Sequence, residues 1–278
     1  MVSLLLAIAS SALIAIIMRI STNKVKAGKT MLAANYLVCF LMAALYAGFD
    51  RLFPAVSGFP AALGLGVING ALYLGGFVMM QRNVKRNGVV LSSIFMKLGL
   101  LVPMALSILL FGEMPSWLQI AGFVLALIAI VLINLRKGSQ NATAAGALLL
   151  MLLMNGTADA MSKIFEEVGD TALSDPFLFY TFLVAFLLCL VLVILAKEKP
   201  DRKSILFGIL IGIPNFFSAK FLLMALQQIP AVIVYPTFNV AGLMVVTLAG
   251  VAFFKERLKA HQWVALGIIA AALVMLNV

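Results

Sequence analysis

The chain has 278 residues, of which 64% are apolar and only 11% are charged. This is far more apolar sequence than a water-soluble core of this size can bury, so the composition excludes a soluble domain and places the chain in a lipid bilayer. The net charge of +10 does not indicate nucleic acid as a partner, because basic residues accumulate in the cytoplasmic loops of membrane proteins.

Ten runs of mostly apolar residues follow one another along the chain, each about 17 to 25 residues long and therefore able to cross a bilayer as a helix. We expect these spans at residues 2–18, 30–49, 60–81, 88–111, 116–135, 143–165, 176–196, 204–226, 230–254 and 260–277. The predicted fold class is an all-α integral membrane protein with ten transmembrane helices. The first run has no basic region before it, which favours a retained helix over a cleaved signal peptide.

The ninth run has an earlier copy in the chain, because a shift of 143 positions aligns seven identical residues. The aligned pairs are Val232 and Val89, Phe238 and Phe95, Gly242 and Gly99, Leu243 and Leu100, Val245 and Val102, Phe254 and Phe111, and Glu256 and Glu113. A shift of 144 extends the match to Gly208 and Gly64 and to Tyr180 and Tyr36. Such self-similarity predicts an internal duplication.

We therefore predict two five-helix repeats, at residues 1–137 and 143–278, joined by a linker at 138–142. Because five is odd, the second repeat has to enter the membrane from the opposite side, so the repeats are expected to be inverted. Sixteen of the twenty Lys and Arg residues lie in the connections after the odd-numbered spans. This asymmetry places those connections in the cytoplasm and both termini outside it, for a multi-pass protein of the cytoplasmic (inner) membrane.

Three ionisable residues lie within the expected spans: Lys97, Asp159 and Lys220. Such residues are costly in a bilayer and mark functional positions by default. Asp159 and Lys220 are each about 24 Å from the cytoplasmic start of their span, at about 1.5 Å per residue, so we expect them to form an ion pair. Lys163, one turn beyond Asp159, is the competing partner. A substrate or proton site at Asp159 is the other alternative.

Lys97 lies about 13 Å into its span, and no acidic residue in the other spans is expected at the same depth. One interpretation is that Lys97 is neutral or extends its stem to the cytoplasmic interface. The other is that it lines a wet central cavity and anchors a substrate.

Polar residues at spacing i, i+4, i+7 mark one face of each of three spans. These stripes are Asn69, Tyr73 and Gly76, then Asn155, Asp159 and Ser162, then Tyr235, Asn239 and Gly242. Small and polar faces serve helix packing as readily as binding. Phe216 shares the face of Lys220 and offers an aromatic wall. Pro103, Pro214 and Pro236 are expected to interrupt their helices.

The predicted substrate-binding residues are Lys97, Asn239, Tyr235, Lys220, Phe216, Asn69, Tyr73 and Asn155, and the predicted coupling or ion pair is Asp159 with Lys220. No spacing of Cys, His or acidic residues indicates a metal or another cofactor, and no nucleophile and base occur together. The sequence therefore predicts that the protein is not an enzyme.

Together these features resemble the ten-helix, EamA-type branch of the drug/metabolite transporter superfamily. The resemblance rests on the duplicated five-helix unit, on the run Ala225, Leu226, Pro230, Ala231, and on the glutamates Glu113 and Glu256 that follow two of the spans. It implies a cavity formed by the first, third, fourth, sixth, eighth and ninth helices and a structural role for both glutamates at the start of the next helix. The run 2–18 has no acid, so cation exchange through a glutamate of the first helix cannot be carried over.

The function expected from the residues and the resemblance is a secondary transporter that moves a small organic metabolite by alternating access. Two lysines against one aspartate in the spans favour an anionic group, so we expect a carboxylate-bearing solute such as an amino acid. Coupling to a proton, exchange with a second solute and uniport all stay open. The alternatives are a flippase for a lipid-linked headgroup and, outside transport, a membrane scaffold or receptor. The expected state is a monomer or weak homodimer.

Overall fold

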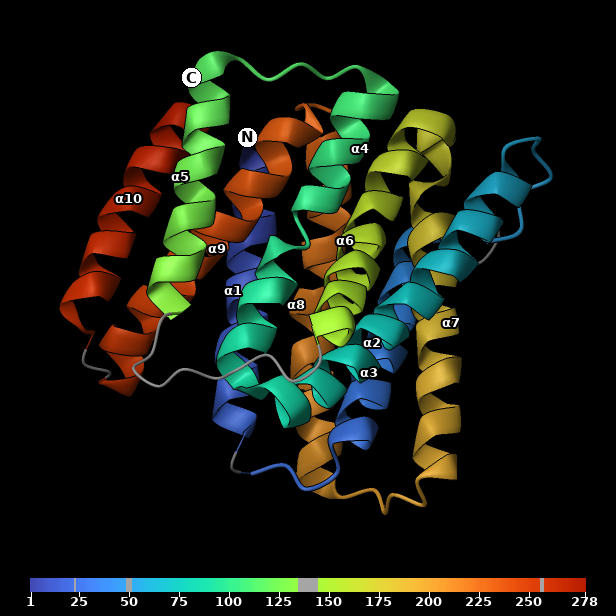
Figure 1. The fold of residues 1–278 in the computed structure, drawn as a ribbon. Helices are drawn as coiled ribbons and strands as arrows, with labels where there is room; N and C mark the ends of the chain where they lie inside the picture. The colour runs from blue at the N-terminus through green and yellow to red at the C-terminus, as the bar shows by residue number, and fades with distance from the viewer. Residues whose placement is uncertain (23, 49–51, 135–144, 256–257) are drawn as a thin grey trace. The chain divides into compact units, whose positions relative to one another are not determined.

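A computed structural model describes residues 1–22, 24–48, 52–134, 145–255 and 258–278. The regular structure of these residues is helical, as expected for apolar segments that have to satisfy their own backbone N–H and C=O groups in lipid. The helices are α1 (Val2–Ser21), α2 (Gly28–Ala47), α3 (Phe59–Leu98), α4 (Leu101–Phe111), α5 (Trp117–Asn134), α6 (Ala145–Val168), the short 3₁₀ helix η2 (Thr171–Leu173), α7 (Ser174–Leu195), α8 (Arg202–Leu226), α9 (Ala231–Phe254) and α10 (Ala260–Leu276) (Figure 1).

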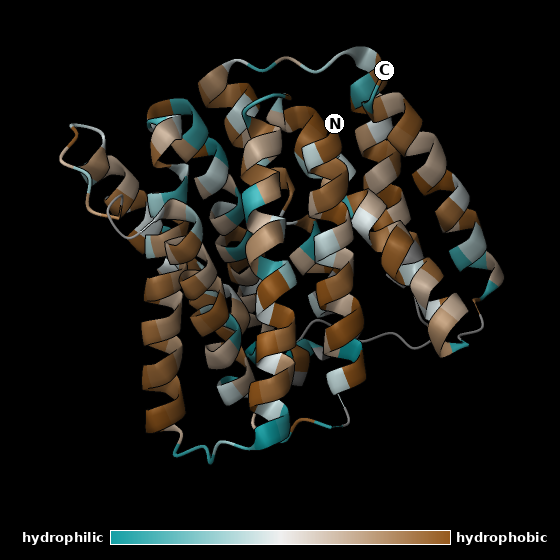
Figure 2. Ribbon diagram, turned by 180° about the vertical axis from the view of Figure 1, so that it is seen from behind, coloured by the Kyte–Doolittle hydropathy of each residue, from teal (hydrophilic) through white to brown (hydrophobic). Residues whose placement is uncertain are grey.

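The helices confirm the all-α membrane prediction. Within the described residues, eight stretches are long and apolar enough to cross a membrane, and the apolar stretches of α5 and α10 are shorter. Long parts of the helical surface are apolar (Figure 2). Large apolar side chains such as Leu109, Phe253 and Leu195 are 79%, 76% and 74% exposed, which fits contact with lipid and not with water. A full count of ten membrane spans stays a prediction.

The predicted connection between the third and fourth spans, at residues 82–87, is wrong: α3 runs through it as one 40-residue helix. No glycine or proline interrupts the sequence there. Asn83 also ties the helix to its surroundings, because its side-chain amide donates to the Met79 carbonyl at 3.0 Å and to the Ala147 carbonyl of α6 at 2.8 Å. Asn87 then donates to the Asn83 side chain at 2.9 Å.

The helix ends instead at Gly99 and Leu100, and the reason is Pro103. Proline has no N–H to donate to the carbonyl four residues earlier, and its ring clashes with that carbonyl, which belongs to Gly99. The N–H groups of Gly99 and Val102 accordingly donate to carbonyls three residues earlier, at 3.2 and 3.0 Å. The expected interruption by Pro103 is thus present, and it separates α3 from α4.

The chain forms two compact units, and each draws on both sequence halves. Unit 1 contains Met1–Leu74 and Ile164–Ala225, and unit 2 contains Gly75–Lys163 and Leu226–Val278. The predicted repeat boundaries are a statement about sequence duplication and stay a prediction. The predicted linker at 138–142 lies outside the described residues.

In unit 1, α2 packs against α7, with the start of α2 beside the end of α7. The Thr30 N–H donates to Glu198 Oε1 at 2.8 Å, and Glu198 Oε2 is 3.7 Å from Lys29 Nζ. The Ala27 N–H donates to Ser204 Oγ of α8 at 3.2 Å. The basic connections after α1 and after α7 therefore lie together at one end of unit 1.

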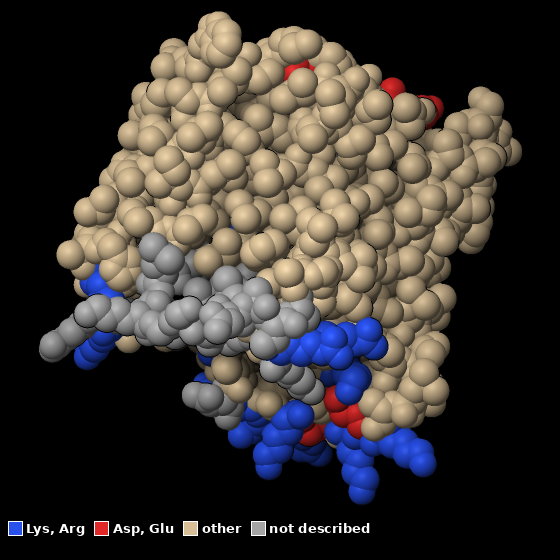
Figure 3. All heavy atoms as spheres, in the orientation of Figure 1, with Lys and Arg blue, Asp and Glu red and all other residues tan. Residues whose placement is uncertain are grey.

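Asp201 begins α8 at this end. Its carboxylate accepts the N–H groups of Lys203 and Ser204, each at 3.0 Å. These hydrogen bonds, together with one from the Ser204 hydroxyl, lower the pKa of the Asp201 carboxyl from its ordinary value. In the face shown in Figure 3, Lys and Arg gather along one edge, while uncharged side chains cover most of the rest.

Two helix pairs of unit 1, α3 with α7 and α8 with α2, are packed through the same kind of glycine contact. In α3, Gly66 and Gly70 lie so close to α7 that an added Cβ would be 2.9 Å from the Phe177 carbonyl oxygen and 2.5 Å from that of Thr181. In α8, Gly208 and Gly212 lie equally close to α2, where an added Cβ would be 2.4 Å from the Met31 carbonyl oxygen and 2.7 Å from that of Asn35. Small residues four positions apart allow this close approach of two membrane helices.

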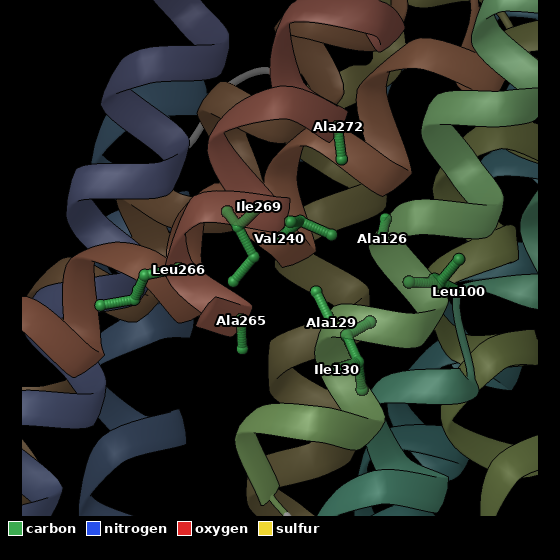
Figure 4. Close-up of a cluster of buried hydrophobic side chains, with 9 residues drawn as sticks. All are labelled: Leu100, Ala126, Ala129, Ile130, Val240, Ala265, Leu266, Ile269 and Ala272. Atoms are coloured by element: carbon green, nitrogen blue, oxygen red, sulfur yellow. The ribbon is translucent and has the colours of Figure 1, made fainter. Parts of the chain in front are cut away.

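The core of unit 2 lies between α5, α9 and α10. Its buried side chains come from these helices and from the start of α4 (Figure 4): Leu100, Ala126, Ala129, Ile130, Val240, Ala265, Leu266, Ile269 and Ala272. Most are small or β-branched, and α5 also approaches α10 through Gly122, where a Cβ would be 3.1 Å from the Ala272 carbonyl oxygen. Alanine and glycine at the contact let the helix axes come close.

We predict that Gly70→Leu destabilises the protein strongly, because any side chain there meets the α7 backbone. Overpacking of this kind costs about 1–3 kcal/mol or more. Gly64→Leu on the same helix is the matched control, since a Cβ there meets nothing within 4 Å. Thermal unfolding of the purified protein in detergent should show a lower melting temperature for Gly70→Leu alone. Equal melting temperatures for the two variants would contradict the close helix contact.

Candidate functional site

Lys97 and Asp159 both lie in unit 2. Lys97 lies in the last turn of α3, directly before the break at Gly99, where the helix dipole favours a cation. Asp159 lies on α6, and the two charges interact electrostatically. Gly156, one turn before Asp159, has its Cα against the break, since an added Cβ would be 2.4 Å from the Gly99 carbonyl oxygen. The expectation that Lys97 has no acidic residue at its depth is therefore wrong.

This pair has polar neighbours from α9 and α6. The Tyr235 hydroxyl of α9 donates to the backbone carbonyl of Asp159 at 2.7 Å. One turn on, the Asn239 side-chain amide donates to the Tyr235 carbonyl at 3.1 Å. On α6, the Asn155 amide donates to the Met151 carbonyl at 2.8 Å. Tyr235 is fully buried, while both asparagines, Lys97 and Asp159 are half-buried.

Five of the predicted residues lie in unit 2, and the structure links three of them directly, since Lys97 interacts with Asp159 and Tyr235 bonds to the Asp159 carbonyl. The other two are Asn155, one turn before Asp159 on α6, and Asn239, one turn after Tyr235 on α9. A cation, an anion and two amide groups lie on segments of α3, α6 and α9. The side-chain amides of Asn155 and Asn239 each donate one N–H to a carbonyl of their own helix. Their oxygens accept no hydrogen bond from the described residues. The group can therefore offer a positive charge, a negative charge and neutral acceptors to a small polar molecule.

Lys220 belongs to unit 1, where its ammonium is 2.7 Å from Asp175 Oδ1. Lys163, the other partner considered for Asp159, instead has its ammonium 2.8 Å from Glu113 Oε1. The pairing of Asp159 with Lys220 was expected because each charge would otherwise be alone. That reason is removed, since each has an opposite charge within its own unit. The pair itself stays a prediction.

The remaining predicted residues lie in unit 1. Asn69 is 1% exposed, and its Oδ1 has no hydrogen-bond partner among the described residues. Tyr73, one turn on, stacks on Phe182 with ring centres 6.3 Å apart and lies at the same distance from Tyr36. Phe216 is fully buried, with its ring centre 6.4 Å from that of Phe182. The predicted aromatic wall is therefore present, as a connected set of rings.

Residues 143–278 match the EamA-like transporter family. This stretch belongs to that family. The match confirms the resemblance seen in the sequence for this half of the chain, and the apolar helices indicate a multi-pass membrane protein. Among the described residues, no group of three or more His, Cys, Asp or Glu is placed to hold a metal ion.

Two further proteins are similar to the EamA-like chain over its whole length. An "Uncharacterized protein" of Haemophilus influenzae (strain ATCC 51907 / DSM 11121 / KW20 / Rd) is 27% identical over 280 residues, which are 96% of this chain and 94% of that protein. One crystal structure superposes with a TM-score of 0.80 and 16% identity, over 99% of this chain and 94% of that chain. The second similarity shows the fold alone.

Glu113 forms a contact that the sequence did not reveal. It follows Gly112, whose φ of +68° reverses the chain after α4. Its carboxylate binds the Lys163 ammonium at 2.8 Å through Oε1 and accepts the Val232 N–H at the start of α9 at 3.0 Å through Oε2. We call Glu113, Lys163 and the start of α9 the α9 clamp. A carboxylate is stabilised at a helix N-terminus, where N–H groups lack partners.

The resemblance implied that Glu113 serves the start of the next helix, but its carboxylate serves α9 instead. Lys163, expected near the end of the span 143–165 as a competing partner for Asp159, is 3% exposed and pairs with Glu113. The sequence signal was the order glycine then glutamate directly after an apolar helix, together with Pro230 at the start of α9. That signal predicts a carboxylate at the end of a helix, but not which helix start donates its N–H groups to the carboxylate. The matching Glu256 lies outside the described residues.

We predict that Lys163→Met destabilises the protein far more than Lys29→Met. Removing one member of a buried ion pair costs about 3–5 kcal/mol, whereas a partly exposed pair is worth about 0–1 kcal/mol. The side chain of Lys29 is 34% exposed and that of Lys163 is 4% exposed. Thermal unfolding in detergent measures both, and Glu113→Gln combined with Lys163→Met should recover part of the loss. Equal melting temperatures for the two single variants would remove the clamp as a stabilising contact.

Proposed function

We propose that the protein is a secondary transporter that moves a small organic metabolite with a carboxylate, such as an amino acid, across the cytoplasmic membrane by alternating access. The observation that carries the proposal is the electrostatic interaction of Lys97 with Asp159, on two helices that touch at Gly99 and Gly156 where α3 gives way to α4. Ionisable groups inside membrane segments mark solute pathways by default. Both side chains are half-buried, so neither is sealed in a packed core.

The charges of this site now favour a zwitterion over a simple anion. The expected excess of one positive charge does not hold, because Lys220 is paired with Asp175 and Lys97 interacts with Asp159. An amino acid presents a carboxylate to Lys97 and an ammonium to Asp159, so both charges keep a partner when it binds. Asn239 and Asn155 supply neutral hydrogen bonds, and Tyr235 fixes the segment of α6 that carries Asp159. Asn69, Tyr73, Phe216 and Lys220 belong to unit 1 and are proposed as substrate-binding residues of that unit by itself.

The repeated helix contact of unit 1 supports the inverted repeat on which alternating access depends. The pair α3 and α7 and the pair α8 and α2 make the same glycine contact. The start of α2 lies beside the end of α7, so the two copies run in opposite directions. Inverted copies around a central site allow one fold to open to either side of the membrane.

We expect Lys97→Met to lower transport at least about tenfold, because it removes the positive charge proposed to hold the carboxylate, and a close charge interaction is worth about 2 kcal/mol or more. The assay is uptake of each of the twenty amino acids into proteoliposomes. Lys199→Met, on an exposed residue, is the matched control. Lys97→Met combined with Asp159→Asn removes both charges, so it should regain melting temperature without regaining transport. Unchanged uptake by Lys97→Met, or a native solute that is a simple organic cation, would overturn the proposal.

The proposed orientation places both termini outside the cytoplasm. The basic connections after α1 and after α7 lie at one end of unit 1, and clustered Lys and Arg next to membrane helices face the cytoplasm. We predict that a fluorescent protein that matures only in the cytoplasm stays dark when fused after Val278, while alkaline phosphatase fused there is active. A bright fusion would mean that the number of membrane crossings differs from ten.

A further inference from the structure

An ammonium group is enclosed at one end of unit 1. The Lys220 ammonium is 2.7 Å from Asp175 Oδ1, 4.2 Å from the centre of the Tyr46 ring and 6.0 Å from the centre of the Phe216 ring. A carboxylate with aromatic ring faces within about 6 Å is the arrangement that recognises ammonium ions in general. We call Asp175, Tyr46 and Phe216 the ammonium box and Lys220 its occupant.

The walls of the box are held by the fold and not by the occupant. Asp175 is the second residue of α7, Tyr46 is the last but one of α2, and Phe216 lies on α8. The rings of Tyr46 and Phe216 are 5.4 Å apart, and Phe217 packs edge-on against Tyr46 at 5.9 Å. The Lys220 ammonium, by contrast, sits on a flexible stem of four methylene groups. The box can therefore exist with its occupant turned away.

The box is open to molecules outside the protein. The side chains of Asp175 and Lys220 are 31% and 18% exposed, and Tyr46 is 51% exposed. A buried structural ion pair, such as Lys163 with Glu113 at 4% and 14% exposure, offers no such access. The box lies at the end of unit 1 opposite the basic connections, since Tyr46 ends the helix that Thr30 and Glu198 fix at its start.

We propose that the ammonium box is a binding site for small primary amines, whose ammonium group replaces that of Lys220 against Asp175, Tyr46 and Phe216. Lys220 is then a tethered competitor that keeps the box filled when no amine is present. At Asp175 one ammonium replaces another, so the charge inside the box is unchanged, while the Lys220 ammonium turns out of the box on its tether. The inference does not depend on transport at Lys97 and Asp159. It concerns side chains of unit 1 and the equilibrium binding of an amine to them.

The experiment removes the Lys220 side chain by mutation and supplies a free alkylammonium ion in its place. In Lys220→Ala the box lacks its ammonium, and n-butylammonium has the length and charge of the missing side chain. We expect n-butylammonium to raise the melting temperature of purified Lys220→Ala more than 1-butanol does at equal concentration. Its half-saturating concentration should be at least about tenfold lower than for the wild-type protein, because the tethered competitor is gone.

Two matched variants test the walls. Asp175→Asn and Tyr46→Leu, each combined with Lys220→Ala, should abolish the difference between n-butylammonium and 1-butanol. Equal effects of the two compounds on folded Lys220→Ala, or a difference that survives both wall variants, would overturn the proposal. If Lys220→Ala does not fold, the same comparison is made between the wild-type protein and Tyr46→Leu. Stabilisation by n-butylammonium that is specific to the wild type then supports the box, and its absence from both refutes it.

Discussion

The cost of placing a charge in a lipid bilayer decides where this chain keeps its ionisable side chains. Lys97, Lys163 and Lys220 lie in apolar helices, and each interacts with an acid of its own unit: Lys163 and Lys220 form ion pairs with Glu113 and Asp175, and Lys97 interacts electrostatically with Asp159. Only one of these acids lies in the middle of a helix. Glu113 and Asp175 lie at helix ends, where the chain can place a carboxylate beside a neighbouring helix. An opposite charge nearby within the same unit lowers the cost of keeping each lysine in the membrane.

The sequence was sufficient for the helical membrane class of the fold and for naming candidate site residues, because both follow from local patterns. Apolar runs of membrane length predict helices, and polar residues four and seven apart predict a shared face. It was insufficient for the partners. Depth counted along separate helices matched Asp159 with Lys220 and left Lys97 without a partner. The depth of Lys97 was counted from an assumed connection near residue 85, and acids just outside the spans were left out. In the structure α3 runs through that connection, and Lys97 is thereby carried to its end, beside Asp159.

The two units use the same device to fix a helix start. After α4, Gly112 has a φ of +68° and the next residue, Glu113, accepts the Val232 N–H of α9; after α7, Lys197 has a φ of +48° and Glu198 accepts the Thr30 N–H of α2. A left-handed residue turns the chain back sharply, so the following carboxylate points at a neighbouring helix and not into solvent. The partner lysine sets the strength, because Lys163 is buried and Lys29 is partly exposed. The same arrangement of a left-handed residue followed by a glutamate thus gives a strong contact at the start of α9 in unit 2 and a weaker one at the start of α2 in unit 1.

The glycine contact that occurs twice in unit 1 is the packing that the predicted duplication would produce. In the first pair, Gly66 of α3 faces Phe177 of α7, an offset of 111 positions. In the second pair, Gly208 of α8 faces Met31 of α2; a shift of 144 places these residues at positions 64 and 175, again 111 apart. The helices of each pair run in parallel, so equal offsets mean equal register. The glycines themselves differ by two positions between the copies, because register is set by the helix contact as a whole while the small residue can move along it.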